Sequence, residues 1–199
     1  VQVASNATLR MFGGDIYVSV MTVINSVRQI AQTPVMAVTD GASPAISYNY
    51  GAAVYGRVCA ATRFMTQLSF GYTLLIWALI SAFPAAFIMI FNHDAELVAA
   101  AVPALHIYFF GFVMMAFQFS GQCVFKSLNK ARLAVFFSLL RKAFIVVPLT
   151  LLLPHIGGLG VNGVFLAEPV SNLVGGLACY ITMRLTVMPE LKRLPSQNT

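Results

Sequence analysis

Long apolar stretches alternate with short polar ones along the whole chain. A helix needs about 20 mostly apolar residues to cross the hydrocarbon core of a bilayer. Five stretches reach that length with few charged residues, and each is predicted to form a spanning helix: 16–38, 64–91, 97–125, 133–154 and 161–185. The pattern therefore predicts an all-α fold, a polytopic bundle of about five transmembrane helices.

Glycine-rich turns mark where helices end. Gly13 and Gly14 predict that residues 1–12 are the tail of a sixth helix that ends in a turn. The glycines within 157–160 predict a turn between the last two spans. We expect residues 1–199 to form a single helical lobe, in which 186–199 is a cytoplasmic tail.

The composition supports a membrane location. Hydrophobic residues make up 59% of the 199 residues and charged residues only 9%, and the mean hydropathy is +0.82. An average soluble domain carries roughly 25% charged residues, so this chain has too little charge to cover a water-exposed surface. The chain opens on Val1, without an initiator Met or a signal-peptide pattern, and we therefore expect a fragment of a longer protein.

Motifs for enzymatic chemistry are missing from the sequence. It has no HExxH, no P-loop, no GxGxxG after a strand and no Ser/His/Asp set, which predicts that the protein is not an enzyme. Cys59, Cys123 and Cys179 show no CxxC spacing, so neither disulfides nor a metal site is indicated, and no cofactor is expected. The net charge of +6 comes without a basic stripe bearing interleaved aromatic residues, which argues against a nucleic-acid partner.

The basic residues predict the orientation of the chain. The connections at 13–15, 92–96 and 155–160 contain no Lys or Arg. The alternate connections and the C-terminus hold most of them: Arg57, Arg63, Lys126, Lys130, Arg132, Arg184, Lys192 and Arg193. Because Lys and Arg accumulate in cytoplasmic loops, we expect a multi-pass plasma-membrane protein whose C-terminus is cytoplasmic.

Glu168 is the single carboxylate within the last span. It lies seven residues past the predicted start of the helix, about 10 Å along its axis, and Pro169 follows it. A carboxylate at that depth is costly unless it is paired, protonated or facing water. Two interpretations remain open: a proton or cation site that lines a cavity, or a rim carboxylate that reaches the surface or pairs with a neighbouring helix.

Arginines and glutamines interrupt two other spans. Arg28 and Gln32 share a helical face, with Gln29 beside them, and either line a passage or bond to neighbouring helices. Arg141 and Lys142 are adjacent and point about 100° apart on an α-helix, so only one is expected to face a given cavity. Arg141 either holds a carboxylate or forms part of an inner gate, or else it extends with Lys142 to the cytoplasmic surface.

The remaining polar candidates lie in the third span and after the first. His106, Gln118 and Gln122 are polar positions within 97–125, and we consider all three as cavity residues. Asp40 opens a segment of small and turn-forming residues at 40–53. There the helix is expected to be bent or broken, as in the discontinuous helices of transporters, or to end in a cytoplasmic loop.

A family signature lies in that segment. Residues 41–52 read Gly-Ala-Ser-Pro-Ala-Ile-Ser-Tyr-Asn-Tyr-Gly-Ala, and Arg57 follows. This resembles the G-x-x-P-x-I-S-Y-N-Y-G-A … R signature of multidrug and toxic compound extrusion (MATE) transporters, most of all the MepA-like branch. The signature positions are Gly41, Pro44, Ser47, Tyr48, Asn49, Tyr50, Gly51 and Arg57. Residues 13–15, 137–142, 148–149 and 158–164 resemble the family's loop after its seventh helix and its eleventh and twelfth helices.

The resemblance implies one lobe of a two-lobe transporter with twelve helices. This chain would be most of the C-terminal lobe, and the missing N-terminal lobe would be its partner. Such proteins export hydrophobic or organic, often cationic, compounds in exchange for Na⁺ or H⁺. Several members use carboxylates on the seventh and tenth helices, but the stretch 97–125 contains none. We therefore do not transfer that cation site, and Glu168 is the coupling residue that we expect.

Two other functions remain open. A flippase for lipid-linked oligosaccharides or a similar amphiphile, from the same superfamily, would favour several inward-facing arginines, for which Arg28 and Arg141 are the candidates. A structural membrane subunit that transports nothing would need no buried ionisable groups, and would be favoured if Glu168 and Arg28 faced lipid headgroups.

Overall fold

The computed structural model describes residues 2–156 and 158–194, and every regular element within them is a helix. The α-helices are α1 (Gln2–Gly13), α2 (Asp15–Gly51), α3 (Tyr55–Ala82), α4 (Pro84–Met89), α5 (Ala95–Phe109), α6 (Met115–Ser127), α7 (Ala131–Leu139), α8 (Val147–Leu152), α9 (Val161–Thr182) and α10 (Met188–Arg193). Short 3₁₀ turns, η1 (Phe112–Met114) and η3 (Leu153–His155), and π-helical turns, η2 (Leu140–Val146) and η4 (Met183–Val187), join several of them. The all-α prediction is confirmed.

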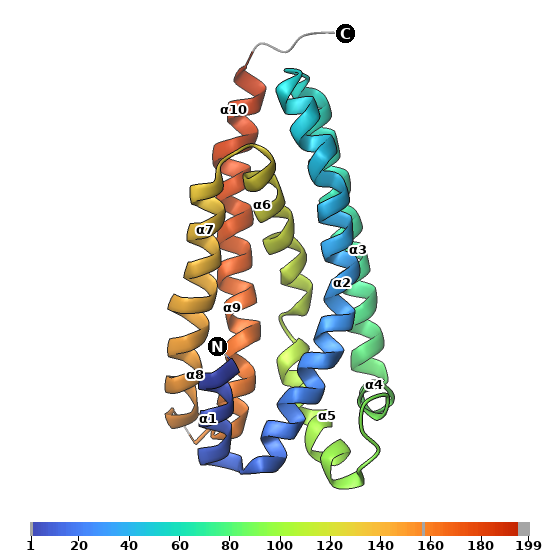
Figure 1. Ribbon diagram of the computed structural model, residues 1–199, viewed down its shortest axis with the longest axis vertical. Coiled ribbons are helices and arrows are strands. Elements are labelled where there is room, and N and C mark those ends of the chain that lie inside the picture. The colour runs from blue at the N-terminus through green and yellow to red at the C-terminus, as the bar shows by residue number, and fades with distance from the viewer. Residues whose placement is uncertain (1, 157, 195–199) are drawn as a thin grey trace.

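The long helices run side by side along one axis of the molecule (Figure 1). The elements α7 to η3 form one continuous helix, and so do the elements α9 to α10. Helix α2 packs along α3, whereas α9 packs against α5, α6, α8 and η2. The turns α2–α3 and α6–α7 lie at the same end as α10, and the turns α1–α2 and α8–α9 lie at the other (Figure 1). The predicted basic connections therefore share one end of the bundle.

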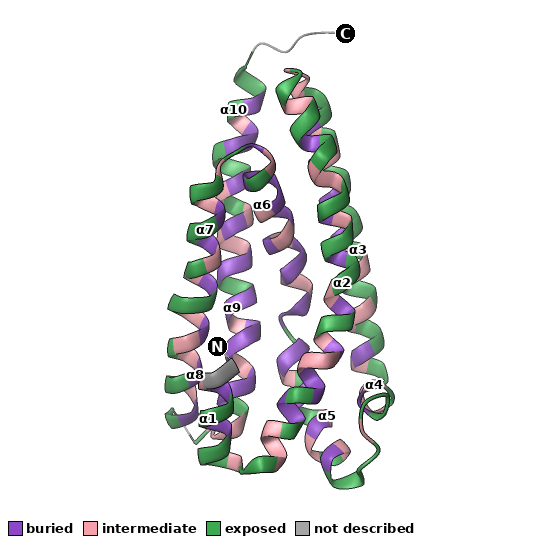
Figure 2. Cartoon of the chain, viewed as in Figure 1, coloured by how far each residue is buried: buried purple, intermediate pink, exposed green. Residues whose placement is uncertain are grey.

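The exterior of the bundle is apolar. Large hydrophobic side chains such as Phe64, Phe136, Phe144 and Leu185 are exposed on its outer helices, and the exposed residues cover the outward faces in Figure 2. The described residues include three helices long and apolar enough to cross a membrane, and the pair α5–α6, bent by 42°, makes a fourth. In the helix that begins at Val161, 56% of an apolar 18-residue stretch is buried, against 28% and 22% of the corresponding stretches in the other two, which makes it the most central of the three.

Helix α2 is longer than predicted. It runs to Gly51 as a continuous helix, so the predicted end at residue 38 is wrong and the helix is not broken within 40–51. The alternative, a helix that ends within 40–53 and is followed by a loop, agrees with the end at Gly51. Pro34 and Pro44 each remove one amide donor from the helix, yet the surrounding turns remain helical. The Asn49 side chain donates to the carbonyl of Ala45 over 2.7 Å, which supports the last turn.

Helix α3 begins and ends earlier than the predicted span 64–91. It starts at Tyr55 and ends at Ala82, before Pro84. Phe83 has φ −130° and ψ 53°, outside the helical region, because a residue that precedes proline is sterically restricted. The hydrophobic run continues through this break, so composition alone does not reveal it.

The expected tail is in large part helical. Helix α10 extends α9 to Arg193, and its Met188 and Leu191 are buried against the bundle. Glu190 forms an ion pair with Lys130 in the α6–α7 turn. The segment predicted as a tail from residue 186 is therefore helical and packed against the bundle up to Arg193, and residues 195–199 lie outside the described part of the chain.

Two apolar cores occupy the two ends of the bundle. One contains Ile24 and Phe109 and lies toward α1, and the other contains Ile46 and Phe125 and lies toward α10. On α6 and α9 the polar candidates fall between the residues that each helix contributes to these cores. On α2, Arg28, Gln29 and Gln32 lie around Ala31, the last residue that α2 contributes to the first core. The fold therefore places a polar layer halfway along the lobe.

Candidate functional site

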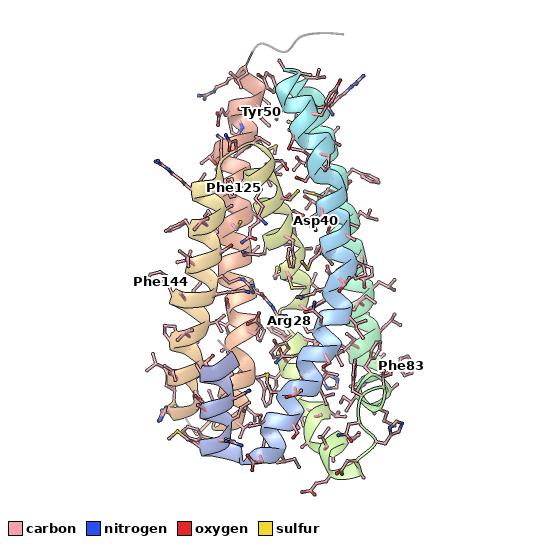
Figure 3. All side chains as sticks on the ribbon, in the orientation of Figure 1. Arg28, Asp40, Tyr50, Phe83, Phe125 and Phe144 are labelled. Carbon is pink, nitrogen blue, oxygen red and sulfur yellow. The ribbon has the colours of Figure 1, made fainter. Side chains whose placement is uncertain are left out.

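Three ionisable residues from three helices meet in this polar layer. Arg28 of α2 places its Nη2 atom 2.6 Å from Oε1 of Glu168 on α9. Arg141 of η2 places its Nη1 atom 3.1 Å from the same oxygen. The side chains of Arg28, Glu168 and Arg141 are 19%, 10% and 8% exposed. Figure 3 shows Arg28 near the middle of the bundle. We call these three residues the ion cluster.

Neutral side chains complete the hydrogen bonds of the ion cluster. Arg28 donates from Nη1 to the Tyr108 hydroxyl over 2.9 Å, and that hydroxyl donates to Oδ1 of Asn25 over 3.2 Å. Arg141 donates from Nη1 to Oδ1 of Asn172 over 2.7 Å. These bonds fix the orientation of both guanidinium groups, which a buried charge requires if its desolvation is to be compensated.

The local structure around Arg141 is unusual and positions its side chain. The residue lies in a π-helical turn, a form that is rare and concentrated at functional sites. Its carbonyl accepts a hydrogen bond from Ser171 Oγ over 3.2 Å, across the interface with α9. A Cβ atom on Gly175 would lie 3.2 Å from Cβ of Arg141, so glycine leaves room for the arginine to cross α9.

Two hollows adjoin the ion cluster. The first, of about 470 Å³, extends toward α8, and we call it the α8 hollow; it is lined by Ser5, Met21, Asn25, Arg28, Tyr108, Lys142, Val146, Thr150, Val164, Ala167 and Glu168. The second, of about 450 Å³, extends toward the α6–α7 turn, and we call it the glutamine hollow; it is lined by Asn25, Arg28, Gln29, Gln32, Met36, Gln118, Phe119, Gln122, Ser138, Arg141 and Lys142. Arg28 borders both hollows, so the ion cluster forms their boundary.

Most of the predicted cavity residues lie along these hollows. Gln29, Gln32, Gln118 and Gln122 line the glutamine hollow. Asp40 borders a smaller neighbouring hollow of about 80 Å³, and Figure 3 shows it further along α2 than Arg28.

His106 and Lys142 depart from the sequence interpretation. His106 is exposed, lies within hydrogen-bonding distance of the carbonyls of Val102 and Ser81, and lines none of these three hollows. Lys142 borders the glutamine hollow together with Arg141, so the expectation that only one of them faces a given cavity is wrong. A π-helical turn holds more residues than an α-helical one, which brings successive side chains closer in direction.

The signature residues lie at the end of the bundle. Ser47 donates to the carbonyl of Ser127 over 3.1 Å, at the C-terminus of α6. The Asn49 carbonyl accepts from the amide of Val54 over 2.9 Å and closes the turn into α3, and the rings of Tyr50 and Tyr55 pack 5.9 Å apart across that turn. Gly41, Pro44, Tyr48, Gly51 and Arg57 are all exposed. The signature thus forms the α2–α3 corner rather than the lining of the polar layer.

Three residues of the site were missed by the sequence interpretation. Asn25 lies three residues before Arg28, and Asn172 lies four residues after Glu168, so each shares a helical face with a candidate already identified. That spacing was the available signal. Tyr108 gave none, because its ring is one of many aromatic side chains in an apolar helix.

The sequence was compared with known proteins. A family model described as MatE matches residues 1–152. The chain belongs to the MatE family. No curated protein matches the sequence. The MatE model covers α1 to α8 as well as the signature corner, so Arg28 and Arg141 lie within the matched region and Glu168 lies beyond it.

Solved transporter structures share the fold of this MatE chain. An outward-facing multidrug resistance MATE transporter is 18% identical, with a TM-score of 0.89, over 96% of this chain and 43% of its own. An inward-facing one is 17% identical, with a TM-score of 0.87, over 97% and 44%. A MOP-superfamily transporter from Pyrococcus furiosus, in which reverse polarity of the binding pocket suggests a different function, is 17% identical, with a TM-score of 0.88, over 96% and 43%. The chain thus spans less than half the length of these transporters.

Proposed function

We propose that this chain is a lobe of a multidrug exporter, which moves organic compounds out across the plasma membrane in exchange for Na⁺ or H⁺. The observation that carries the proposal is the buried ion cluster at the boundary between two polar hollows within an apolar bundle. Ionisable groups at such depth mark transport pathways more often than structural sites. The match to both outward-facing and inward-facing transporters supports alternating access, and the basic end of the bundle supports a cytoplasmic C-terminus.

Glu168 is the proposed coupling residue. A proton or Na⁺ that reaches its carboxylate from the α8 hollow weakens the attraction of that carboxylate for Arg28 and Arg141. The ion pairs join α9 to α2 and to η2, so cation binding changes the energy of separating these helices. A ligand shifts a conformational equilibrium only through such a difference in affinity between states.

A transport assay of the full-length protein tests this role. Glu168→Gln keeps the shape of the side chain and removes its charge, and we expect it to abolish cation-driven efflux. Asp15→Asn is the matched control, because Asp15 is an exposed carboxylate paired with Arg10 at the α1–α2 turn. Unchanged efflux by the Glu168→Gln protein, at an equal amount of folded transporter, would remove Glu168 from the mechanism.

The lobe alone is expected not to transport. A passage that opens alternately to two sides needs two bodies that move against each other, and this chain supplies a single helical bundle. Liposomes that contain only residues 1–199 should show no cation-driven uptake, whereas liposomes with the full-length protein should. Uptake by the former would refute the proposal that the two lobes act together.

Flippase activity toward a lipid-linked oligosaccharide or a similar amphiphile is the second candidate function. It is favoured by one observation: Arg28 and Arg141 both border the glutamine hollow instead of the bundle surface. The third alternative, a structural subunit, was tied to Glu168 and Arg28 facing lipid headgroups, and their mutual ion pair inside the lobe does not favour it.

A further inference from the structure

We propose that the glutamine hollow is an anion-binding subsite, which receives the carboxylate, sulfate or phosphate group of the transported organic compound. This inference rests on the proposed function in one respect: the hollow must belong to the transport path. It adds the charge of the substrate, which the proposed export of organic compounds does not specify.

Positive charge exceeds negative charge around the glutamine hollow. Arg28, Arg141 and Lys142 border the glutamine hollow, and no carboxylate does within the described part of the chain. Glu168 is the single carboxylate in contact with the two arginines, and Lys142 is not in the ion pairs that the structure defines. One carboxylate therefore faces two guanidinium groups, and the exposed Lys142 adds a third positive charge at the border of the hollow.

The other five acidic residues of the sequence lie elsewhere. Asp15 pairs with Arg10, and Glu190 pairs with Lys130. Asp94 and Glu96 lie at the start of α5, where the Asp94 side chain accepts from the amide of Glu96. Asp40 borders the small hollow beside Lys126. The excess positive charge of the polar layer thus has no other acidic partner among the described residues, and an anion would balance it in surroundings where charge interactions are strong.

The side-chain amide of Gln118 is buried without a hydrogen-bond partner. Gln118 lines the glutamine hollow and is 2% exposed. Neither its Nε2 nor its Oε1 atom has a hydrogen-bond partner. Gln122, by contrast, donates to Ser138 over 2.8 Å, and Gln32 donates to Gln29 over 3.0 Å. Buried polar groups are almost always paired, so Gln118 is the donor that remains available to a ligand.

The glutamine hollow has the size and the mixed lining of a small-molecule site. Its volume of about 450 Å³ lies within the range of small-molecule sites. Met36 and Phe119 line it beside the glutamines, and they offer apolar contact next to the charged wall. The hollow therefore suits an anionic group attached to an apolar body better than it suits a free inorganic ion.

Glu168 competes with such an anion. Its carboxylate is already paired with the guanidinium groups of Arg28 and Arg141. An anionic ligand that enters from the glutamine hollow would bind the same two groups. Removing the charge of Glu168 therefore strengthens the binding of an anion and weakens the binding of a cation. The sign of this effect distinguishes the two classes of substrate.

The test is equilibrium binding to the full-length protein in nanodiscs of zwitterionic lipid, without any cation gradient. Hexyl phosphate, hexyltrimethylammonium and hexyl glucoside share one tail and differ in the charge of the head, and inorganic phosphate supplies the head alone. We expect hexyl phosphate to bind most tightly of the four. Gln118→Leu should weaken the binding of hexyl phosphate about tenfold, because it removes one hydrogen bond to a charged group. Lys142→Gln should weaken this binding about threefold. Glu168→Gln should strengthen it.

Arg132→Gln is the matched control, because Arg132 is an exposed cation on α7 that lines neither hollow. Tightest binding of hexyltrimethylammonium, weaker hexyl phosphate binding in Glu168→Gln, or equal losses in Arg132→Gln and Lys142→Gln would each overturn the inference. Hexyl phosphate binding without efflux would instead contradict only the exchange proposal, and efflux without a preference for hexyl phosphate would contradict only the anion subsite.

Discussion

Glu168→Ala is expected to lower the free energy of unfolding by about 3–5 kcal/mol, the usual result of removing one partner from a buried ion pair. The substitution leaves Arg28 and Arg141 beside each other with no carboxylate between them, at side-chain exposures of 19% and 8%. Their repulsion and the uncompensated burial of both charges act in the same direction. Denaturation of the detergent-solubilised protein, followed by circular dichroism, measures the loss.

Asp15→Ala provides the comparison. The pair Arg10–Asp15 has a similar geometry, 2.9 Å between Nε and Oδ1, but its side chains are 71% and 83% exposed. An exposed pair contributes at most about 1 kcal/mol, so this variant should unfold almost as the unaltered protein does. If the two substitutions had equal effects, the ion cluster would be accessible to water rather than buried.

Gly111→Ala is expected to be the second most damaging change. A Cβ atom at this position would lie 2.5 Å from the carbonyl oxygen of Pro169 and 2.7 Å from its Cα. Both are backbone atoms, so no side chain can rotate away, and the α5–α6 bend must separate from α9. Overpacking of this kind costs about 1–3 kcal/mol and at times more.

Gly71→Ala separates the steric effect from the change in helix propensity. Apart from the backbone of its own helical turns and its two chain neighbours, no atom lies within 4 Å of a Cβ atom built on Gly71, which is in the middle of α3. Alanine is the better helix former by up to about 1 kcal/mol, so this variant should be as stable as the unaltered protein or more so. Gly111→Ala should therefore shift the denaturation curve toward lower stability, whereas Gly71→Ala should leave it in place or shift it toward higher stability. Parallel shifts would contradict the close approach of the bend to α9.

The architecture was predictable because hydrophobic length and glycine-rich turns determine it. Gly13 and Gly14 end α1 where expected, and the last long helix starts at Val161. The boundaries of α2 and α3 were not predictable from composition. Pro44 interrupts the hydrogen bonding of α2 without ending it, whereas Pro84 ends α3, and the difference depends on neighbouring helices.

The members of the candidate site were easier to identify than their pairing. Glu168, Arg28 and Arg141 are recognisable one by one, because an ionisable residue in an apolar helix is costly. The contact between these side chains depends on how α2, η2 and α9 are rotated relative to one another. Packing sets that rotation, and the paired residues are 140 positions apart for Arg28 and Glu168 and 27 apart for Arg141 and Glu168. No local pattern encodes that rotation.

The π-helical turn has one further consequence. A turn closed by hydrogen bonds to the fifth residue instead of the fourth contains, in effect, one inserted residue. Deleting Ala143 would let the ladder from α7 to α8 close as an ordinary α-helix. Arg141 and Lys142 would then lie about 100° apart around the helix, farther apart in direction than in the wider π-helical turn. The shared facing of these two cations toward the glutamine hollow therefore depends on chain length in this segment as well as on residue type.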